Sequence, residues 1–410
     1  MKILHTSDWH LGRSLYDKKR YDEFESFLDW LINFITGNKI DLLLVAGDIF
    51  DTTTPGNKAQ ELYYRFLGQI RQTGCRHVVI TGGNHDSPTF LDSPKNILGY
   101  LDIHVVGSVT DDPADEIFVI RNKNGLAEAI VCAVPFLHDR DVRTAEADET
   151  PGDKSQKLMQ GIAAHYRKIV AAAKKLQDKK NPVPLIGMGH LFTRNAKTTE
   201  GDGVRELYIG SIAHVDGESV SNGFDYMALG HLHLTQKIDN SETVRYSGSP
   251  IQLSFSEADQ TKKVIVAEFG KKTPVITEHP VPCFQQLIRI AGDQDQVSVK
   301  IEKLIKKGTS AWLEVEITSL TDLTNINARF EEMLTGSNLE ILRIKNKTAV
   351  DRAMTRLNDT ETLETLDDAD VFARCLEAFE VPEEDRGPLT ETYNEAKASW
   401  LAADPNAVLT

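Results

Sequence analysis

The stretch Lys2-Ile3-Leu4-His5-Thr6-Ser7-Asp8-Trp9-His10 decides the fold class of this 410-residue chain. Its first five residues, Lys2–Thr6, form a short, mainly apolar run that predicts a buried strand. Two residues of metal-binding type, Asp8 and His10, follow this strand directly. The same order of apolar run and metal-binding residues recurs downstream, so this stretch sets the pattern for the first part of the chain.

Four further strands are predicted on the same grounds, at Leu42–Val45, His77–Ile80, Pro184–Met188 and Tyr226–Leu229. Apolar residues at helical spacing predict a helix over Tyr21–Ile35, and a second helix is expected within Pro55–Thr73. Short strands that alternate with helices predict an α/β domain. Two charged stretches that contain Pro or Gly, Asp111–Glu116 and Arg140–Lys154, are expected to be surface loops.

The pattern changes around residues 275–282, where Pro274, Pro280 and Pro282 interrupt it. A β-α-β-α-β order then predicts a small separate α+β domain, with elements at Phe284–Ile290, Gln296–Lys306, Ala311–Ile317, Leu323–Leu334 and Leu339–Ile344. After Lys347 the sequence is polar and acidic, with amphipathic helices expected at Asp367–Phe379 and Arg386–Ala402. We therefore expect three parts, over residues 1–274, 275–347 and 348–410.

The composition is that of a cytoplasmic globular protein. Hydrophobic residues make up 40% of the chain, enough for a sizeable core, and no run of about 18 apolar residues predicts a membrane span. The first residues lack the apolar stretch of a signal peptide. The four cysteines are scattered without a CxxC pair, so we expect reduced thiols and neither a disulfide framework nor a zinc site.

The net charge of −15 argues at first against a nucleic-acid partner, because such proteins usually carry a basic surface. Its distribution weakens that objection. Residues 351–410 hold 15 acidic and 5 basic residues, a net charge of −10, which leaves only −5 for the first 350 residues. Bound divalent cations would make the field at a site in that part more positive.

Five clusters of metal-binding residue types each stand at the end of a predicted strand. They are Asp8-Trp9-His10, Gly47-Asp48-Ile49-Phe50-Asp51, Gly83-Asn84-His85-Asp86, Gly189-His190 and Gly230-His231-Leu232-His233. In α/β sheets the ligand crevice lies outside the carboxyl ends of the strands, so we expect the five clusters to converge on one site.

The residue types in these clusters fit hard or borderline divalent metals. Carboxylates and an amide oxygen suit Mn²⁺ or Mg²⁺, and imidazole suits Mn²⁺, Fe²⁺ or Zn²⁺. A bridging carboxylate can hold two ions roughly 3.5–4 Å apart, a separation suited to in-line displacement at phosphorus. The clusters therefore predict a two-metal phosphoesterase.

Taken singly, some of these residues could have a structural role and no metal. Asp8 could cap a helix, Asn84 could be a turn residue, and His190 alone would be read as a core histidine. The five clusters together make coincidence a poor explanation. His85 adjoins Asn84 and cannot easily share its direction, so we expect a general acid or a donor to a phosphate oxygen, oriented by Asp51 or Asp86.

At these motifs the chain resembles the calcineurin-like metallophosphoesterases. Over its whole length it is similar to the SbcD/Mre-type nucleases of double-strand-break repair. The most specific stretches are Ile3–Gly12, Val45–Thr52 and Arg245-Tyr246-Ser247-Gly248-Ser249-Pro250-Ile251. The resemblance covers residues 1–350 well, and after that only the general plan matches.

The resemblance implies a role for each matching residue. One metal would be held by Asp8, His10, Asp48 and His233, and the other by Asp48, Asn84, His190 and His231, with Asp48 bridging. His85 would be the catalytic histidine. The implied fold is a two-sheet sandwich flanked by helices, followed by a small capping domain and C-terminal helices. Asp51 departs from relatives outside bacteria, which often have His there, so no role for its side chain carries over.

The resemblance also implies partners. It predicts a homodimer formed through parts of Pro55–Thr73 and Pro88–Leu101. It further predicts that the C-terminal helices bind the SMC-like ATPase SbcC, in a complex of two copies of each protein at the nucleoid. The implied activity is Mn²⁺-dependent, with Mg²⁺ or Fe²⁺ as alternatives. It combines a double-strand 3′–5′ exonuclease with a single-strand and hairpin endonuclease in DNA repair, recombination and replication.

Two other functions use the same residues. A phosphomonoesterase or cyclic-nucleotide phosphodiesterase would need the same ligands, and the residues beyond the first domain favour the nuclease over it. A scaffold with a structural metal site would not need His85. The sequence has no GxxxxGK[ST] motif for ATP and no GxSxG motif for a serine nucleophile.

Overall fold

The computed structural model describes residues 1–144, 149–198, 215–270, 273–318 and 326–346, and in the C-terminal part 372–373, 376, 381 and 383–403. The chain divides into two compact units, Met1–Leu287 and Ile288–Thr410. The candidate site residues all lie in the first unit, which is built around two six-stranded sheets.

The first sheet has the order β14-β13-β1-β4-β5-β6. Its strands β1, β4, β5 and β6 run parallel to one another, while β13 is antiparallel to β1 and β14 is antiparallel to β13. The bounds are β1 Lys2–Thr6, β4 Leu42–Ala46, β5 His77–Thr81, β6 Ile103–Val106, β13 Lys263–Glu268 and β14 Val275–Pro280.

The second sheet has the order β11-β12-β10-β9-β8-β7. Strands β8, β9, β10 and β12 are parallel, and β7 and β11 are antiparallel edge strands. The bounds are β7 Ile117–Arg121, β8 Ala127–Ala133, β9 Leu185–His190, β10 Tyr226–Gly230, β11 Gln236–Lys237 and β12 Val244–Tyr246.

The two sheets pack face to face, and helices cover their outer faces. Along β4, Leu42 and Leu44 belong to the core between the sheets, whereas Leu43 and Val45 face the helices. Strands buried on both faces have continuous apolar runs, which is why these strands could be predicted without alternation. This arrangement confirms the predicted two-sheet sandwich flanked by helices.

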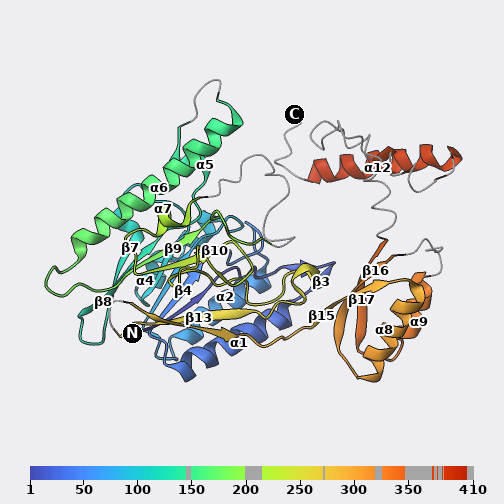
Figure 1. The fold of residues 1–410 in the computed structure, drawn as a ribbon, viewed down its shortest axis with the longest axis horizontal. Coiled ribbons are helices and arrows are strands. Elements are labelled where there is room, and N and C mark those ends of the chain that lie inside the picture. Colours follow the sequence, from blue (N-terminus) through green and yellow to red (C-terminus); the bar gives the residue numbers. More distant parts are fainter. Residues whose placement is uncertain are drawn as a thin grey trace. The chain divides into compact units, whose positions relative to one another are not determined.

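Helix α1, Tyr21–Asn38, and helix α2, Asn57–Ile70, bury their apolar faces in the core outside the first sheet. Helix α6, Pro151–Leu176, packs with the short helix α7, Gly217–Ser221, outside the second sheet. Figure 1 shows α1 and α6 on opposite sides of the strands. Two further short helices, α3 Pro88–Asp92 and α4 Lys95–Gly99, precede β6.

The prediction of a surface loop over Arg140–Lys154 is wrong at both ends of this range. Helix α5 occupies Asp139–Val142, and α6 begins at Pro151. Thr150 Oγ1 accepts a hydrogen bond from Asp153 N at 3.2 Å, and the Asp153 carboxylate accepts one from Thr150 N at 3.1 Å. This reciprocal capping starts the helix in a charged stretch that reads as a loop. The other predicted loop, Asp111–Glu116, contains the 3₁₀ turn η1, Pro113–Glu116.

The second unit contains the three-stranded sheet β15-β16-β17 with two helices on one face. The bounds are β15 Leu287–Gly292, α8 Gln294–Lys306, β16 Ala311–Ile317, α9 Ile326–Leu334 and β17 Leu339–Asn346. This order matches the predicted β-α-β-α-β series. The predicted start of this part at residue 275 lies within β14, which pairs with β13 of the first sheet, and the first compact unit continues to Leu287.

Helix α12, Glu383–Ala403, corresponds to the last predicted helix, Arg386–Ala402. Most of the helix predicted at Asp367–Phe379 lies outside the described residues. Within it, the Phe372 ring stacks on Tyr393 of α12, with centroids 4.1 Å apart and an interplanar angle of 8°. None of the described helices combines the length and the apolar composition needed to cross a bilayer.

Candidate metal centre

The five clusters lie at the carboxyl ends of parallel strands from both sheets. Asp8 and His10 follow β1, Asp48 follows β4, and Asn84 and His85 follow β5 of the first sheet. His190 ends β9, and His231 and His233 follow β10 of the second sheet. Because the sheets face each other, these side chains come from opposite layers of the sandwich.

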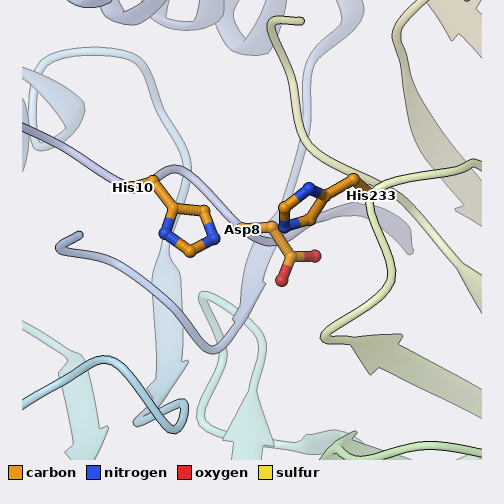
Figure 2. A group of neighbouring side chains, drawn as sticks. All are labelled: Asp8, His10 and His233. Carbon is orange, nitrogen blue, oxygen red and sulfur yellow. The ribbon is translucent and has the colours of Figure 1, made fainter. Parts of the chain in front are cut away.

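One group consists of Asp8, His10 and His233, which are completely buried. One ligand atom from each lies within 4.8 Å of the other two. Figure 2 shows the three side chains around a common point. His10 Nε2 is also 3.5 Å from Asp48 Oδ2, which adds the fourth member of the first predicted ligand set.

A second group gathers around His190 Nε2. This nitrogen lies 3.3 Å from Asp48 Oδ2, 3.1 Å from Asn84 Oδ1 and 3.2 Å from His231 Nδ1. The structure therefore brings together all the residues of the second predicted ligand set as well. The same oxygen, Asp48 Oδ2, lies near a histidine of each group, as a bridging ligand would.

The backbone of several of these residues has a left-handed conformation. The φ angles are 53° at Asp8, 47° at His10, 51° at Asp48 and 102° at His231. Non-glycine residues rarely adopt such angles, and where they do the surrounding structure has to enforce them. Main-chain bonds from Asp8 N to Gly47 O and from His10 N to Asp48 O, both 3.0 Å, join the two loops.

The glycine that precedes most ligands is required by space. A Cβ on Gly230 would lie 1.8 Å from the carbonyl oxygen of Ala46, and a Cβ on Gly83 would lie 2.1 Å from Asp48 Oδ1. Both are far inside contact distance. Gly230 thus allows the two sheets to approach each other, and Gly83 allows the loops after β4 and β5 of the first sheet to approach each other.

Three of the histidines have an oxygen near Nδ1. His233 Nδ1 donates to Glu257 Oε1 at 3.0 Å and His190 Nδ1 donates to the carbonyl of Ala46 at 2.9 Å, which leaves Nε2 of each as the acceptor that faces the centre. His10 Nδ1 lies 3.3 Å from the Asp51 carboxylate, within ion-pair range but without a hydrogen bond. Arg13 Nη1 donates to the Asp51 carboxylate at 3.1 Å and so keeps this carboxylate beside His10.

The electrostatics of the centre favour an added positive charge. Burial raises the pKa of Asp8 to about 6, although nearby histidines oppose the rise. Burial would lower the pKa of His190, but Asp48 and Asp8 outweigh it and raise that pKa to about 9. The carboxylates thus draw a proton onto a fully buried histidine, and a divalent cation would supply that charge directly.

Buried polar atoms without protein partners also fit a metal. Within the described part of the chain, His10 Nε2 and Asp48 Oδ2 are buried and have no hydrogen-bond partner. Leaving buried polar atoms unpaired costs about 1–3 kcal/mol each, unless something else binds them. Carboxylate, amide and imidazole donors with no thiolate suit hard or borderline divalent ions. The residues therefore fit the predicted pair of cations.

His85 stands beside these groups. Its ring lies 4.9 Å from that of His10, centroid to centroid, and its Nδ1 donates to the main-chain carbonyl of Asp51 at 2.9 Å. The carbonyl, and not a carboxylate of Asp51 or Asp86, therefore orients it. Asp86 instead accepts hydrogen bonds from the backbone N–H groups of Gly83, Ile49 and Phe50 and so holds the loop that carries Asp48.

Several supporting residues were not identified from the sequence. Ser7 Oγ donates to Asp8 and lies 2.7 Å from Ser247 Oγ, and Glu257 lies behind His233. Ser247 falls in one of the most specific stretches of the family pattern, which was the available signal. Glu257 lies 24 residues from its partner in a stretch without metal-binding neighbours, and no local pattern marks it.

A family model described as calcineurin-like phosphoesterase matches residues 1–234. The match covers the strands and loops that carry the centre, so the class of this protein is that of the calcineurin-like phosphoesterases. A second model, described as the type 5 capsule protein repressor C-terminal domain, matches residues 283–379.

The similarity to known relatives identifies the family of this chain within the phosphoesterase class. The SbcD protein of the nuclease SbcCD from Escherichia coli (strain K12) is 34% identical over 396 residues, which cover 96% of this chain and 97% of that protein. Its namesake from Rhodobacter capsulatus is 35% identical over 266 residues, 63% of this chain and 64% of that protein. The chain therefore belongs to the SbcD family, which confirms the resemblance read from the motifs. A solved dimetal phosphatase from Danio rerio covers 69% of this chain and 97% of its own at 11% identity, with a TM-score of only 0.38.

Proposed function

We propose that this chain is the Mn²⁺-dependent nuclease component of an SbcCD-like complex and hydrolyses DNA phosphodiester bonds. The observation that carries the proposal is the position of Asp48 Oδ2, 3.5 Å from His10 and 3.3 Å from His190, between two groups of buried ligands. Membership of the SbcD family supports DNA as the substrate. We further propose a cytoplasmic, nucleoid-associated role in DNA repair, recombination and replication.

Each residue of the centre has a role in this proposal. Asp8, His10, Asp48 and His233 would hold one divalent ion, and Asp48, Asn84, His190 and His231 the other. When bound, the ions supply an activated water and neutralise charge on the phosphate. His85 is anchored through Nδ1, so its Nε2 can donate to a phosphate oxygen or give a proton to the leaving group.

A nuclease assay tests the proposal. The full chain with Mn²⁺, with and without an SbcC-type ATPase, is expected to degrade blunt duplexes from 3′ ends and to cut hairpin and single-stranded DNA. A small phosphate monoester serves as the comparison substrate. Efficient hydrolysis of the ester with no cleavage of any DNA would replace the nuclease by the phosphomonoesterase alternative.

We propose that residues 348–410 bind the ATPase. The tail carries most of the negative charge of the chain, which would make association sensitive to salt. Phe372 and Tyr393, one from each predicted C-terminal helix, stack on each other, while Leu389 of α12 is 42% exposed. An amphipathic helix beyond an acidic linker commonly lays its apolar face on a partner, and Leu389 is available for such a contact.

Truncation after Val350 is expected to leave metal binding and basal nuclease activity unchanged, because the centre lies wholly in Met1–Leu287. It is expected to abolish co-purification with the ATPase and the stimulation of cleavage by ATP. Pull-down at two salt concentrations and a nuclease assay with ATP measure these effects. Retention of the ATPase at unchanged affinity would refute the assignment of the tail.

We also propose a homodimer, which would give two copies of each protein in the complex. The exposed apolar side chains of the first unit include Tyr64 on α2, Ile97 on α4 and Tyr100 and Leu101 just after α4. Tyr100 is 90% exposed and Ile97 71%. These residues lie in the two segments, Pro55–Thr73 and Pro88–Leu101, that the resemblance assigns to the dimer.

The double change Ile97→Glu and Tyr100→Glu is expected to weaken dimerisation by roughly tenfold or more, because buried apolar anchors carry most of an interface's energy. Sedimentation equilibrium measures the dissociation constant. Leu126→Glu is the matched control, since Leu126 is 64% exposed but lies before β8, outside both segments. Equal dimer stability in all three proteins would place the interface elsewhere.

A further inference from the structure

The segment Ser247–Lys262, between β12 and β13, contacts His233 through Ser249, Glu257 and Lys262. It contains a buried ion pair between Glu257, with no exposed surface, and Lys262, 4% exposed. We propose that Glu257, held by Lys262, is a positioning residue for His233 that selectively strengthens the metal site of Asp8, His10 and His233. The inference rests on the proposed function, because it presupposes that this group binds a divalent ion.

Every oxygen of Glu257 is engaged. Oε1 accepts a hydrogen bond from His233 Nδ1 at 3.0 Å. Oε2 accepts from Leu253 N at 3.0 Å and from Ser249 Oγ at 3.3 Å, and it pairs with Lys262 Nζ at 2.5 Å. The carboxylate therefore cannot turn away from the imidazole.

Lys262 is equally constrained. Its Nζ contacts Glu257 Oε2, the carbonyl of His233 at 3.0 Å and Gln260 Oε1 at 2.9 Å. Three acceptors match the three N–H donors of an ammonium group. Lys262 thus binds both the carboxylate and the backbone of the histidine that the carboxylate orients.

Glu257 and Lys262 form their contact inside the protein, where neither side chain is solvated. A buried ion pair is seldom more stable than apolar residues of the same size, so stability alone does not explain its presence. A charged acceptor at Nδ1 increases the electron density at Nε2, which strengthens a metal bond at that atom.

The two metal groups differ in this respect. Behind the first group stand two carboxylates, Glu257 at His233 and Asp51 at His10. Behind His190 of the second group stands the neutral carbonyl of Ala46. Nitrogen ligands supported by carboxylates should hold a cation more tightly, so we infer that the first group is the tighter of the two sites.

Two variants test the inference by metal titration. Glu257→Gln keeps an oxygen that can accept from His233 Nδ1 but removes the negative charge. Because that change removes the counter-ion of Lys262, the double variant Glu257→Gln with Lys262→Met removes both charges together. The exposed pair on α8 gives a matched control, Glu302→Gln with Lys306→Met.

Calorimetric titration of chelator-treated full chain with Mn²⁺ is expected to show two sites in the wild type and the control. In both Glu257 variants one site should weaken about 10- to 100-fold, the range for lost supporting partners, while the other is unchanged. Anomalous scattering from Mn²⁺-soaked crystals should place the loss at Asp8, His10 and His233.

Three results are decisive. Wild-type affinity at both sites in the folded double variant would overturn the role of Glu257 and leave the proposed function intact. Equal weakening of both sites would overturn its selectivity. Absence of Mn²⁺ binding in the wild type would instead refute the proposed function itself. Circular dichroism of the metal-free proteins establishes that each variant is folded.

Discussion

Asp48→Asn is expected to lose both metal ions together and to reduce DNA hydrolysis by roughly a thousandfold or more, since metal ions contribute several kcal/mol to such reactions. Asp48 Oδ2 lies 3.5 Å from His10 Nε2 and 3.3 Å from His190 Nε2, so one atom faces both groups. Asparagine keeps one oxygen and removes the charge that draws cations to the site. Isothermal titration with Mn²⁺ and anomalous scattering measure the occupancy.

The other carboxylate oxygen of Asp48 bears on whether the Asp48→Asn variant keeps the conformation of its loop. Asp48 Oδ1 accepts a hydrogen bond from His85 N at 2.9 Å, and an amide oxygen can keep that bond. The loop is therefore expected to hold its conformation in the variant. Asp29→Asn on the exposed side of α1 is the control for loss of a single charge. Two fully occupied ions in Asp48→Asn would rule out the bridging role.

His85→Gln is expected to bind two Mn²⁺ ions normally and to lose most hydrolysis, about 10²- to 10⁴-fold, the usual contribution of a general acid or base. The His85 side chain is anchored by the carbonyl of Asp51, and its Nε2 has no hydrogen-bond partner in the described part of the protein. Glutamine can keep the anchoring bond but cannot transfer a proton. Single-turnover cleavage and metal titration on the same preparation separate the two effects.

A competing assignment exists for this histidine. His10, Asp51 and His85 also offer ligand atoms within 4.8 Å of one another, so His85 could belong to a ligand shell. Loss of one ion in His85→Gln would support that assignment and move His85 out of the catalytic role. The matched control is His104→Gln, because His104 stacks on Phe118 and belongs to none of the ligand clusters.

The site residues could be predicted because they follow strands that are easy to recognise. Strands β1, β4, β5, β9 and β10 are buried on both faces, so each reads as a continuous apolar run with polar residues at its end. The parallel order then brings these ends together. Position after a strand, and not any feature of a single residue, carried the prediction.

Elements defined by distant contacts could not be predicted. Val275–Pro280 reads as a break because Pro274, Pro280 and Pro282 lie in or beside it. It nevertheless pairs with β13 as an edge strand, where Pro280 at its end is tolerated. Glu257 and Lys262 acquire their role only when the chain after β12 returns to His233. The start of α6 was likewise not predicted, because the charged stretch around it resembles a loop and the helix start depends on the capping bonds of Thr150 and Asp153.

The candidate ligands are divided between the two sheets, so metal binding is expected to stabilise the folded protein. Asp8, His10, Asp48 and Asn84 belong to one layer, and His190, His231 and His233 to the other. An ion held by both layers binds only the folded protein. Such binding stabilises the folded state by about 2.7 kcal/mol when the free metal concentration is a hundredfold above the dissociation constant. Cells starved of the metal would then hold more unfolded chain for proteases to remove. If the proposed metal centre is correct, scarcity of its metal would lower the amount of the protein as well as its activity.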